Sequence, residues 1–258
     1  MLILLSPAKS LDYDTPVAAD WPHSLPPFLP ETTELIELLR TKAPQDLAAL
    51  MKISDALAAL NVARYAAWSP EFPPHNARPA ILAFNGDVYD GLNARTLAQS
   101  DLEWAQQHLR ILSGLYGVLR PLDWMQAYRL EMGTRLATPV GNTLYQFWGT
   151  KIAAHLQQEL AHDPTPVVLH LASQEYFKAV DTSVLRSRIV ECVFEEWKGG
   201  SYKIVSFHAK RARGLMARHA ILQRATQPEQ LLGFQEEGYA FDPHASECNR
   251  LVFRRRLM

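Results

Sequence analysis

The sequence is poor in cysteine, since Cys192 and Cys248 are the only two among its 258 residues. Two cysteines cannot build the disulfide framework of a small secreted domain, and their separation is not that of a zinc site. No apolar run approaches the roughly 18 residues that span a bilayer, and the first residues lack the basic start of a signal peptide. These absences predict a cytoplasmic protein without a membrane segment.

Familiar catalytic and cofactor motifs are missing as well. The sequence has no His-Glu-x-x-His pair, no Walker loop, no nucleophile elbow and no Gly-x-Gly-x-x-Gly loop. Its nine histidines are dispersed along the chain, which disfavours direct binding of iron, because an Fe(II) site needs clustered histidines and carboxylates. We therefore expect no cofactor and no metal ion.

The composition that remains is typical of a packed globular protein, with 48% hydrophobic and 10% aromatic residues. Short apolar runs predict strands at residues 2–5, 80–84, 109–112, 167–171, 188–194, 202–208 and 251–255, with another near Tyr239. Gly199 and Gly200 predict a hairpin between two of these strands.

Amphipathic segments predict helices at residues 144–160 and 209–223, and a helix capped by Thr32 or Thr33 that ends near residue 41. Residues 12–30 hold five prolines and predict a long loop. Strands and helices alternate without an internal repeat or a linker. This organisation favours a single α/β (α+β) domain over residues 1–258, with a mixed sheet flanked by helices.

Charge is distributed unevenly, although the net charge is only −1. Residues 198–258 carry 11 Lys and Arg against 5 Asp and Glu, whereas residues 1–197 carry 15 against 22. Because polyanion binding depends on local potential, this end of the chain points to contact with nucleic acid. A solvated helix face balanced by acidic neighbours would have the same composition.

Residues 44–68 predict two short helices around a tight turn, one beginning at Pro44 and the other capped by Ser54 or Asp55. The segment resembles the helix-hairpin-helix of DNA-repair proteins, in which two hairpin positions flank one buried apolar residue. Ile53 takes the buried position here, and Lys52 and Ser54 take the flanking positions, where the motif usually has glycine. Backbone N–H groups at the start of the second helix would bind phosphate, with Lys52 adding charge. An ordinary helical hairpin packed on the core is the alternative.

Residues 209–223 predict a basic helix that directly follows a strand. Lys210, Arg213 and Gly214 fall on one helical face, and Arg218 lies four residues further on. Glycine in a helix costs about 1 kcal/mol relative to alanine, so Gly214 predicts a close backbone approach. We expect a cleft that neutralises phosphates to be lined by Lys210, Arg211, Arg213, Arg218 and Lys9.

Polar residues follow several of the predicted strands. In α/β proteins the loops beyond the strand ends gather at one edge, where ligands bind. We expect a polar pocket formed by Ser6, Lys9, Asp87, Tyr116, Arg129, Glu131, Glu175 and Lys178.

This pocket supports an alternative function, an enzyme acting on a nucleic-acid component or a small phosphorylated ligand. Lys9 or Lys178 would be desolvated, and Asp87, Glu131 or Glu175 would act as acid or base. Buried ion pairs and turn contacts would account for the same residues, so the pattern singles out no catalytic residue.

Seven blocks of the sequence are distinctive as a set. One is Leu-Ser-Pro-Ala-Lys-Ser-Leu-Asp at 5–12, another is Phe-Asn-Gly-Asp-Val-Tyr-Asp-Gly-Leu at 84–92, and the rest lie at 108–123, 128–133, 144–149, 171–178 and 209–218. In these blocks, which are collinear with those of the family, the chain resembles the peroxide stress resistance protein YaaA family from residue 1 to about residue 255.

The resemblance implies a cytosolic bacterial protein of the hydrogen peroxide response, linked to lowering unincorporated iron and to protecting DNA and protein. It also implies binding of duplex or junction DNA through a positively charged cleft and a helix-hairpin-helix, on a fold peculiar to the family. The family has no agreed catalytic reaction, so no catalytic residue transfers to this chain. The leading hypothesis is a protein that binds DNA without reading its base sequence.

Overall fold

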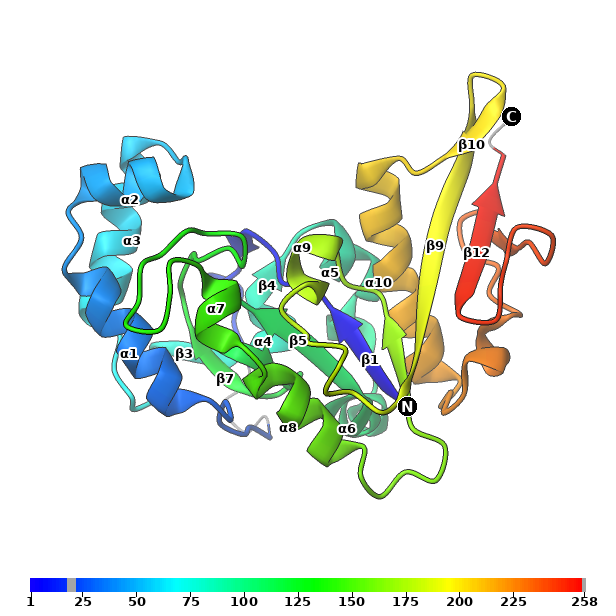
Figure 1. The fold of residues 1–258 in the computed structure, drawn as a ribbon, viewed down its shortest axis with the longest axis horizontal. Helices are drawn as coiled ribbons and strands as arrows, with labels where there is room; N and C mark the ends of the chain where they lie inside the picture. Colours follow the sequence, from blue (N-terminus) through cyan, green and yellow to red (C-terminus); the bar gives the residue numbers. More distant parts are fainter. Residues whose placement is uncertain (18–21, 257–258) are drawn as a thin grey trace.

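Five parallel strands form the centre of an eight-stranded mixed sheet in the computed structural model, which describes residues 1–17 and 22–256 (Figure 1). In their order across the sheet they are β12 (Arg250–Arg255), β9 (Arg188–Lys198), β8 (Val167–His170), β1 (Leu2–Leu5) and β5 (Leu109–Ser113). Three short strands pair antiparallel with them: β11 (Ala240–Phe241) with β12, β10 (Ser201–Lys203) with β9, and β6 (Gly117–Leu119) with β5. The expected mixed α/β fold is therefore confirmed.

The order of the strands reverses beside β1. The chain passes from β1 to β5 on one side and then returns to β8 on the other side of β1. At this point Leu4 is in register with His170, and the N–H of Leu171 donates to the carbonyl of Leu4 at 3.0 Å. In open α/β sheets such a reversal leaves a crevice beyond the carboxyl ends of the two strands, where ligands bind.

The described residues contain ten α-helices. They are α1 (Leu29–Arg40), α2 (Pro44–Met51), α3 (Asp55–Ala67), α4 (Ala80–Ala83), α5 (Asp87–Leu92), α6 (Gln99–His108), α7 (Leu144–Trp148), α8 (Lys151–Glu159), α9 (Gln174–Phe177) and α10 (Ser206–Leu222). Two 3-10 turns are η1 (Ala94–Thr96) and η2 (Pro228–Leu231). Two small sheets pair β2 (Ser10–Leu11) with β4 (Phe84–Asn85) and β3 (Ala77–Pro79) with β7 (Trp124–Gln126).

Helices cover both faces of the sheet, as near-continuous apolar strands such as β1 require. Helix α10 packs against α5 and α6 on one face, and Figure 1 shows α8 crossing in front of the other. Over the residues that the structure describes, no helix combines the length and the apolarity needed to cross a bilayer.

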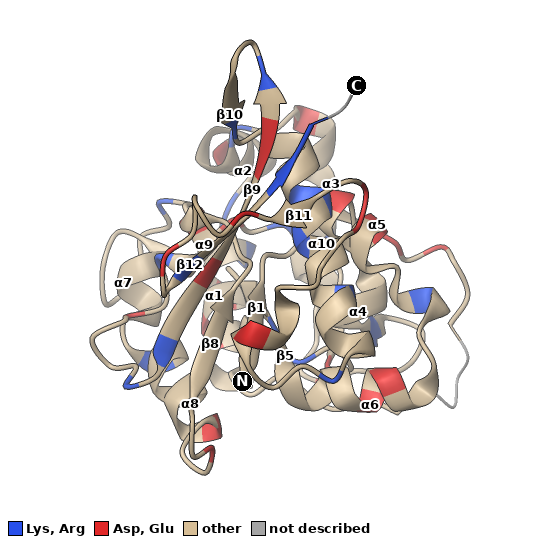
Figure 2. Cartoon of the chain, turned by 90° about the vertical axis from the view of Figure 1, so that its right-hand side faces the viewer, with Lys and Arg blue, Asp and Glu red and all other residues tan. Residues whose placement is uncertain are grey.

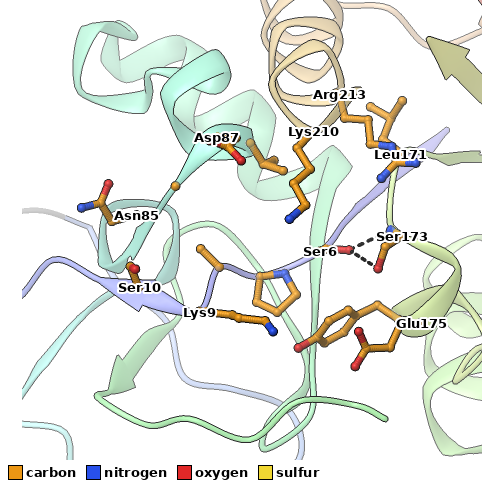
Figure 3. A pocket seen from close by; sticks show the side chains of 15 residues that line it. Ser6, Lys9, Ser10, Asn85, Asp87, Leu171, Ser173, Glu175, Lys210 and Arg213 are labelled. Carbon is orange, nitrogen blue, oxygen red and sulfur yellow. Dashed lines mark hydrogen bonds between the residues drawn. The ribbon is translucent and has the colours of Figure 1, made fainter. Parts of the chain in front are cut away.

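Two glycines bring α5 and α10 into backbone contact. A Cβ atom on Gly214 would lie 1.8 Å from the carbonyl oxygen of Val88, and one on Gly91 would lie 2.3 Å from the carbonyl oxygen of Arg211. The close approach expected at Gly214 is therefore made to another helix. It places Asp87, the first residue of α5, beside the amino-terminal half of α10 (Figure 3).

Helices α2 and α3 pack against each other and are joined by Lys52, Ile53 and Ser54. Lys52 has a left-handed backbone with φ of 53°, a conformation that favours glycine. Ser54 caps α3, because its side chain accepts a hydrogen bond from the N–H of Leu57 at 3.4 Å. The two predicted starts, at Pro44 and after Ser54, are confirmed, and Ile53 is partly buried against the core. These contacts define a packed helical pair.

The strand predicted at residues 80–84 is wrong. Ala80–Ala83 form the short helix α4, and only Phe84 and Asn85 are extended. All four helical residues are buried, so the run has no apolar periodicity to separate a helix from a strand. Alanine and leucine also favour a helix intrinsically.

Other predicted boundaries are also wrong. The helix expected over 144–160 is two helices, because Gly149 adopts a left-handed φ of 47° between α7 and α8. The strand expected over 202–208 ends at Lys203, and α10 begins at Ser206 rather than at residue 209. The hairpin at Gly199 and Gly200 is confirmed, with φ of 61° and 86°.

The first helix is not capped by a threonine. Helix α1 begins at Leu29 with a proline in its first turn, and the hydroxyl of Thr32 donates back to the carbonyl of Phe28 at 2.8 Å. The loop expected over 12–30 therefore ends two residues early, and its residues 18–21 lie outside the described residues.

Candidate functional site

A cavity of about 480 Å³ opens beyond the carboxyl ends of β1 and β8, at the point where the strand order reverses. We call it the switch cavity. Four segments that are distant in sequence line it: the loop after β1, the start of α5, the loop after β8 with α9, and the amino-terminal half of α10 (Figure 3). Its charged lining residues are Lys9, Asp87, Glu175, Lys210 and Arg213.

Ser6 and Ser173 form the floor between the two strand ends. The Ser6 hydroxyl oxygen accepts a hydrogen bond from the N–H of Ser173 at 2.8 Å and lies 3.2 Å from the Ser173 hydroxyl (Figure 3). This link holds the loops after β1 and β8 together, so the lining of the cavity does not depend on one loop alone.

Lys210 and Arg213 are the cations that α10 turns toward the cavity. They are three residues apart and therefore lie on one face of the helix. Neither forms a salt bridge with any residue in the described part of the chain, and burial lowers the pKa of Arg213. A half-buried guanidinium without a carboxylate partner keeps its attraction for an anion.

The other two cations predicted on α10 are engaged with protein groups. Arg211 pairs with Glu237 at 2.7 Å, and Arg218 donates to the carbonyls of Leu92 and Asn93 at 3.1 and 3.0 Å. These contacts tie α10 to neighbouring loops, and neither side chain lines the switch cavity.

His170 is the last residue of β8, lies near enough to Arg213 to be affected by its charge, and is only 3% exposed. Its ring stacks on Phe177 at 3.8 Å, and neither ring nitrogen has a hydrogen-bond partner in the described structure. Burial, and secondarily the charge of Arg213, lower the pKa of His170 to about 4. The ring is therefore neutral at pH 7, and its 3.9 Å approach to Glu191 is not an ion pair at that pH.

Lys9 stands at the rim of the cavity and belongs to a chain of ion pairs. Its ammonium group is 3.0 Å from Glu131, which also pairs with Arg129 at 2.8 Å. The Lys9 side chain remains 63% exposed, so this pair leaves it open to solvent. The carboxylate of Glu175 accepts the N–H of Gly133 at 2.9 Å, which joins the 131–133 segment to the same wall.

The remaining predicted residues lie elsewhere. Tyr116 is fully buried, where its hydroxyl accepts hydrogen bonds from Trp68 and from the N–H of Gln126. Lys178 lies over the ring of Tyr145 at 5.0 Å and lines a different hollow. The α2–α3 pair, with Lys52 and Ser54, lies at one end of the molecule, well separated from α10, as Figure 1 shows.

Exposed aromatic side chains lie next to the basic helix and were not predicted from the sequence. Phe207 is 61% exposed and precedes Lys210 by three residues, and Trp197 near the tip of the β9–β10 hairpin is 38% exposed. Arg256 lies over the ring of Trp197 at 4.9 Å. Figure 2 shows that the basic segments of β10, β12 and α10 lie near one another at this end of the molecule. The signal was present in the sequence as aromatic residues interleaved with lysines, a pattern found in nucleic-acid-binding surfaces.

Within residues 1–17 and 22–256, no group of three or more His, Cys, Asp or Glu side chains is placed to hold a metal ion.

Comparison with known proteins matches the chain to one family along nearly its whole length. The sequence model of a family described as peroxide stress protein YaaA matches residues 1–245. A UPF0246 protein of Paracidovorax citrulli is 69% identical over 256 residues, which cover 99% of both chains. UPF0246 proteins of Delftia acidovorans and Bordetella petrii are 64% and 61% identical, each over 99% of this chain and over 99% and 100% of their own.

Proposed function

This chain belongs to the peroxide stress protein YaaA family, and from that membership we propose that it binds DNA through phosphate contacts, without reading base sequence. Duplex or junction DNA is the proposed partner. Limitation of unincorporated iron, and protection from oxidative damage, are the proposed physiological setting, on the family resemblance alone.

One observation carries the DNA-binding proposal: Lys210 and Arg213 are unpaired within the described residues and open on the same cavity as Lys9. These residues are about 200 positions apart in a chain whose net charge is −1. Asp87 and Glu175 also line this cavity, but no salt bridge joins either of them to Lys210 or Arg213 among the described residues, so two cations that repel each other stay without a partner. A polyanion that releases its counterions on contact supplies the missing interaction.

The α2–α3 pair supplies a second contact in this proposal. Lys52 replaces the glycine usual in such hairpins, yet it keeps the left-handed backbone that glycine provides. In the proposed complex Lys52 contributes charge and the first N–H groups of α3 donate to a phosphate, with Ser54 holding the helix start. The pair and α10 lie well apart (Figure 1), so together they would contact two separated stretches of backbone.

Arg211 and Arg218 are not proposed to contact phosphate directly. Each is held by protein groups, so they contribute to the positive potential and stabilise α10.

Charge reversal on α10 tests the proposal. Lys210→Glu combined with Arg213→Glu should abolish the mobility shift of a duplex oligonucleotide while leaving the circular dichroism spectrum unchanged. Arg186→Glu is the control, because Arg186 is exposed and precedes β9, at the amino ends of the strands and away from the cavity at their carboxyl ends. If the double variant shifts the duplex as well as the wild type does, the DNA surface does not include α10.

The cavity favours a second candidate function, a reaction on a nucleic-acid component or small phosphorylated ligand. Asp87 faces the switch cavity and forms no salt bridge with the described residues, so it is available as an acid or base (Figure 3). Lys9, Arg129 and Glu131 are engaged in ion pairs with one another and Lys178 lies elsewhere, which restricts this candidate to Asp87 and Glu175. Conversion of a nucleotide or oligonucleotide by the wild type, lost in Asp87→Asn, would support it; no conversion by the wild type would remove it.

A further inference from the structure

The switch cavity has an anion-binding wall. Lys210 and Arg213 both line it, and in Figure 3 the ammonium group of Lys210 points into the space above Ser6. Neither side chain forms a salt bridge with the described residues, although the nearby carboxylate of Glu191 favours the charge of Arg213. Burial disfavours the charged form of Arg213. An anion bound beside the guanidinium would therefore replace part of the solvation that burial removes.

Hydroxyl groups lie beside these cations. Ser6 and Ser173 meet at the floor of the cavity, and each carries a rotatable O–H. The Ser6 hydroxyl accepts the N–H of Ser173 and donates to the Ser173 oxygen at 3.2 Å, so the Ser173 proton is free for a ligand oxygen and the Ser6 proton reaches one by rotating away from Ser173. Two cations and two hydroxyls are the donors that a phosphate group with three terminal oxygens requires.

His170 lies near Arg213 and is neutral, so it neither adds to nor neutralises the charge of the anion-binding wall. Its pKa of about 4 means that it adds no charge at pH 7, and its ring stacks on Phe177 and forms no hydrogen bond within the described residues. Glu191 is the acidic group that faces this region, and its carboxylate already accepts a hydrogen bond from the side-chain amide of Gln174 at 3.0 Å. The guanidinium therefore remains available to the cavity.

Acceptors lie beside Lys210, on the side of the cavity away from the two serines (Figure 3). Asp87 and Asn85 come from the start of α5 and the strand before it. A ligand with an anionic group at one end and hydroxyl or amino donors at the other would satisfy both sides of the cavity. The volume of about 480 Å³ lies within the roughly 300–1,000 Å³ of small-molecule sites.

We propose that the switch cavity binds the terminal phosphate of a nucleotide, with Lys210, Arg213, Ser6 and Ser173 holding the phosphate and Asp87 accepting a donor from the sugar or base. The choice of a nucleotide as ligand rests on the proposed DNA binding. A phosphorylated DNA end and a free mononucleotide present the same group, and both would enter in this way.

Calorimetric titration with defined probes tests the proposal. Deoxyadenosine 5′-monophosphate should bind at least tenfold more tightly than deoxyadenosine. Arg213→Gln should weaken the nucleotide by about tenfold to a hundredfold, as expected for loss of a charged hydrogen-bond pair, and Arg213→Lys should recover part of that loss. The control Arg186→Gln should change the affinity by less than twofold.

Two oligonucleotide duplexes, one with 5′-phosphates and one with 5′-hydroxyls, distinguish the two sources of phosphate. If only the 5′-phosphorylated duplex displaces deoxyadenosine monophosphate from the protein, the cavity binds DNA ends. If neither duplex displaces the nucleotide, the cavity binds free nucleotides. Equal binding of nucleotide and nucleoside, or equal effects of Arg213→Gln and Arg186→Gln, would overturn the proposal. Nucleotide binding without any duplex binding would instead contradict the proposed DNA function and leave this site standing.

Discussion

The hydroxyl oxygen of Ser6 accepts the backbone N–H of Ser173 at 2.8 Å, across 167 residues of sequence. This one contact joins the segments that leave β1 and β8, at the point where the sheet reverses its strand order. Because α10 reaches the same point through its contact with α5, cations from the end of the chain face residues from its beginning. The properties proposed for this protein follow from that convergence.

The contact between α5 and α10 depends on Gly214. We expect Gly214→Ala to destabilise the protein by about 1–3 kcal/mol or more, because the new methyl group would lie 1.8 Å from the carbonyl of Val88. This loss should outweigh the roughly 1 kcal/mol by which alanine is favoured over glycine in a helix. Denaturant unfolding would measure it. Gly233→Ala is the control, since nothing lies within 4 Å of a Cβ there, and an equal effect of both substitutions would contradict the packing described.

Substitution of Lys52 should affect the stability of the fold and the binding of DNA in different ways. Lys52→Gly should keep or raise the free energy of unfolding, by up to about 1 kcal/mol, because glycine adopts the left-handed backbone without strain. The same substitution should weaken binding to duplex DNA and reduce the slope of log K against log salt by about 1. Fluorescence anisotropy at several salt concentrations measures the slope. Lys42→Ala, before α2, should leave it unchanged, and an unchanged slope in Lys52→Gly would exclude Lys52 from the DNA contact.

The low pKa of His170 predicts that the protein loses stability as the pH is lowered. Its pKa is about 4 in the folded protein and near 6.5 when exposed, so between these values the unfolded chain binds more protons. Stability from this residue is complete above pH 6.5 and falls as the pH is lowered to 4, by roughly 3 kcal/mol in all. Burial also lowers the pKa values of His108, His155 and His219, which add the same sign.

The contribution of His170 is isolated by substitution. His170→Gln should flatten the fall in the free energy of unfolding between pH 6.5 and 4.5 relative to the wild type, as measured in urea at each pH. Parallel curves for the two proteins would show that His170 is not held neutral by its surroundings.

Exposed Phe207 predicts a preference for unpaired bases near α10. It is 61% exposed and on the same side of the helix as Lys210, so it can stack on a base while the lysine contacts phosphate. Phe207→Ala should weaken binding of a single-stranded oligonucleotide by about five- to a hundredfold, from a stacking contribution of roughly 1–3 kcal/mol. Leu222→Ala, at the other end of α10 and 48% exposed, is the matched control. Equal affinities of the two variants would remove Phe207 from the surface.

The sequence predicted those features that depend on local pattern. The apolar strands, the start of α2 at Pro44, the cap at Ser54 and the hairpin at Gly199 and Gly200 each follow from a few adjacent residues. The shared face of Lys210 and Arg213 follows from helical periodicity in the same way.

What the sequence did not reveal depends on tertiary contacts. Ala80–Ala83 is buried on all sides, so its pattern is equally compatible with helix and strand. The pairing of Arg211 with Glu237, and the burial of Tyr116, require knowledge of which distant segments meet. For the same reason, residues of one strand-end cluster were separated, with Lys9 at the cavity and Lys178 in a different hollow.

The most direct test of the account is the salt dependence of duplex binding by the wild type and by Lys210→Gln with Arg213→Gln. Anisotropy titrations between 50 and 200 mM salt give the slope of log K against log salt, which reports the number of phosphates that the protein neutralises. The account predicts a steep slope for the wild type and one shallower by about 2 for the double variant. Identical slopes for the two proteins would contradict it.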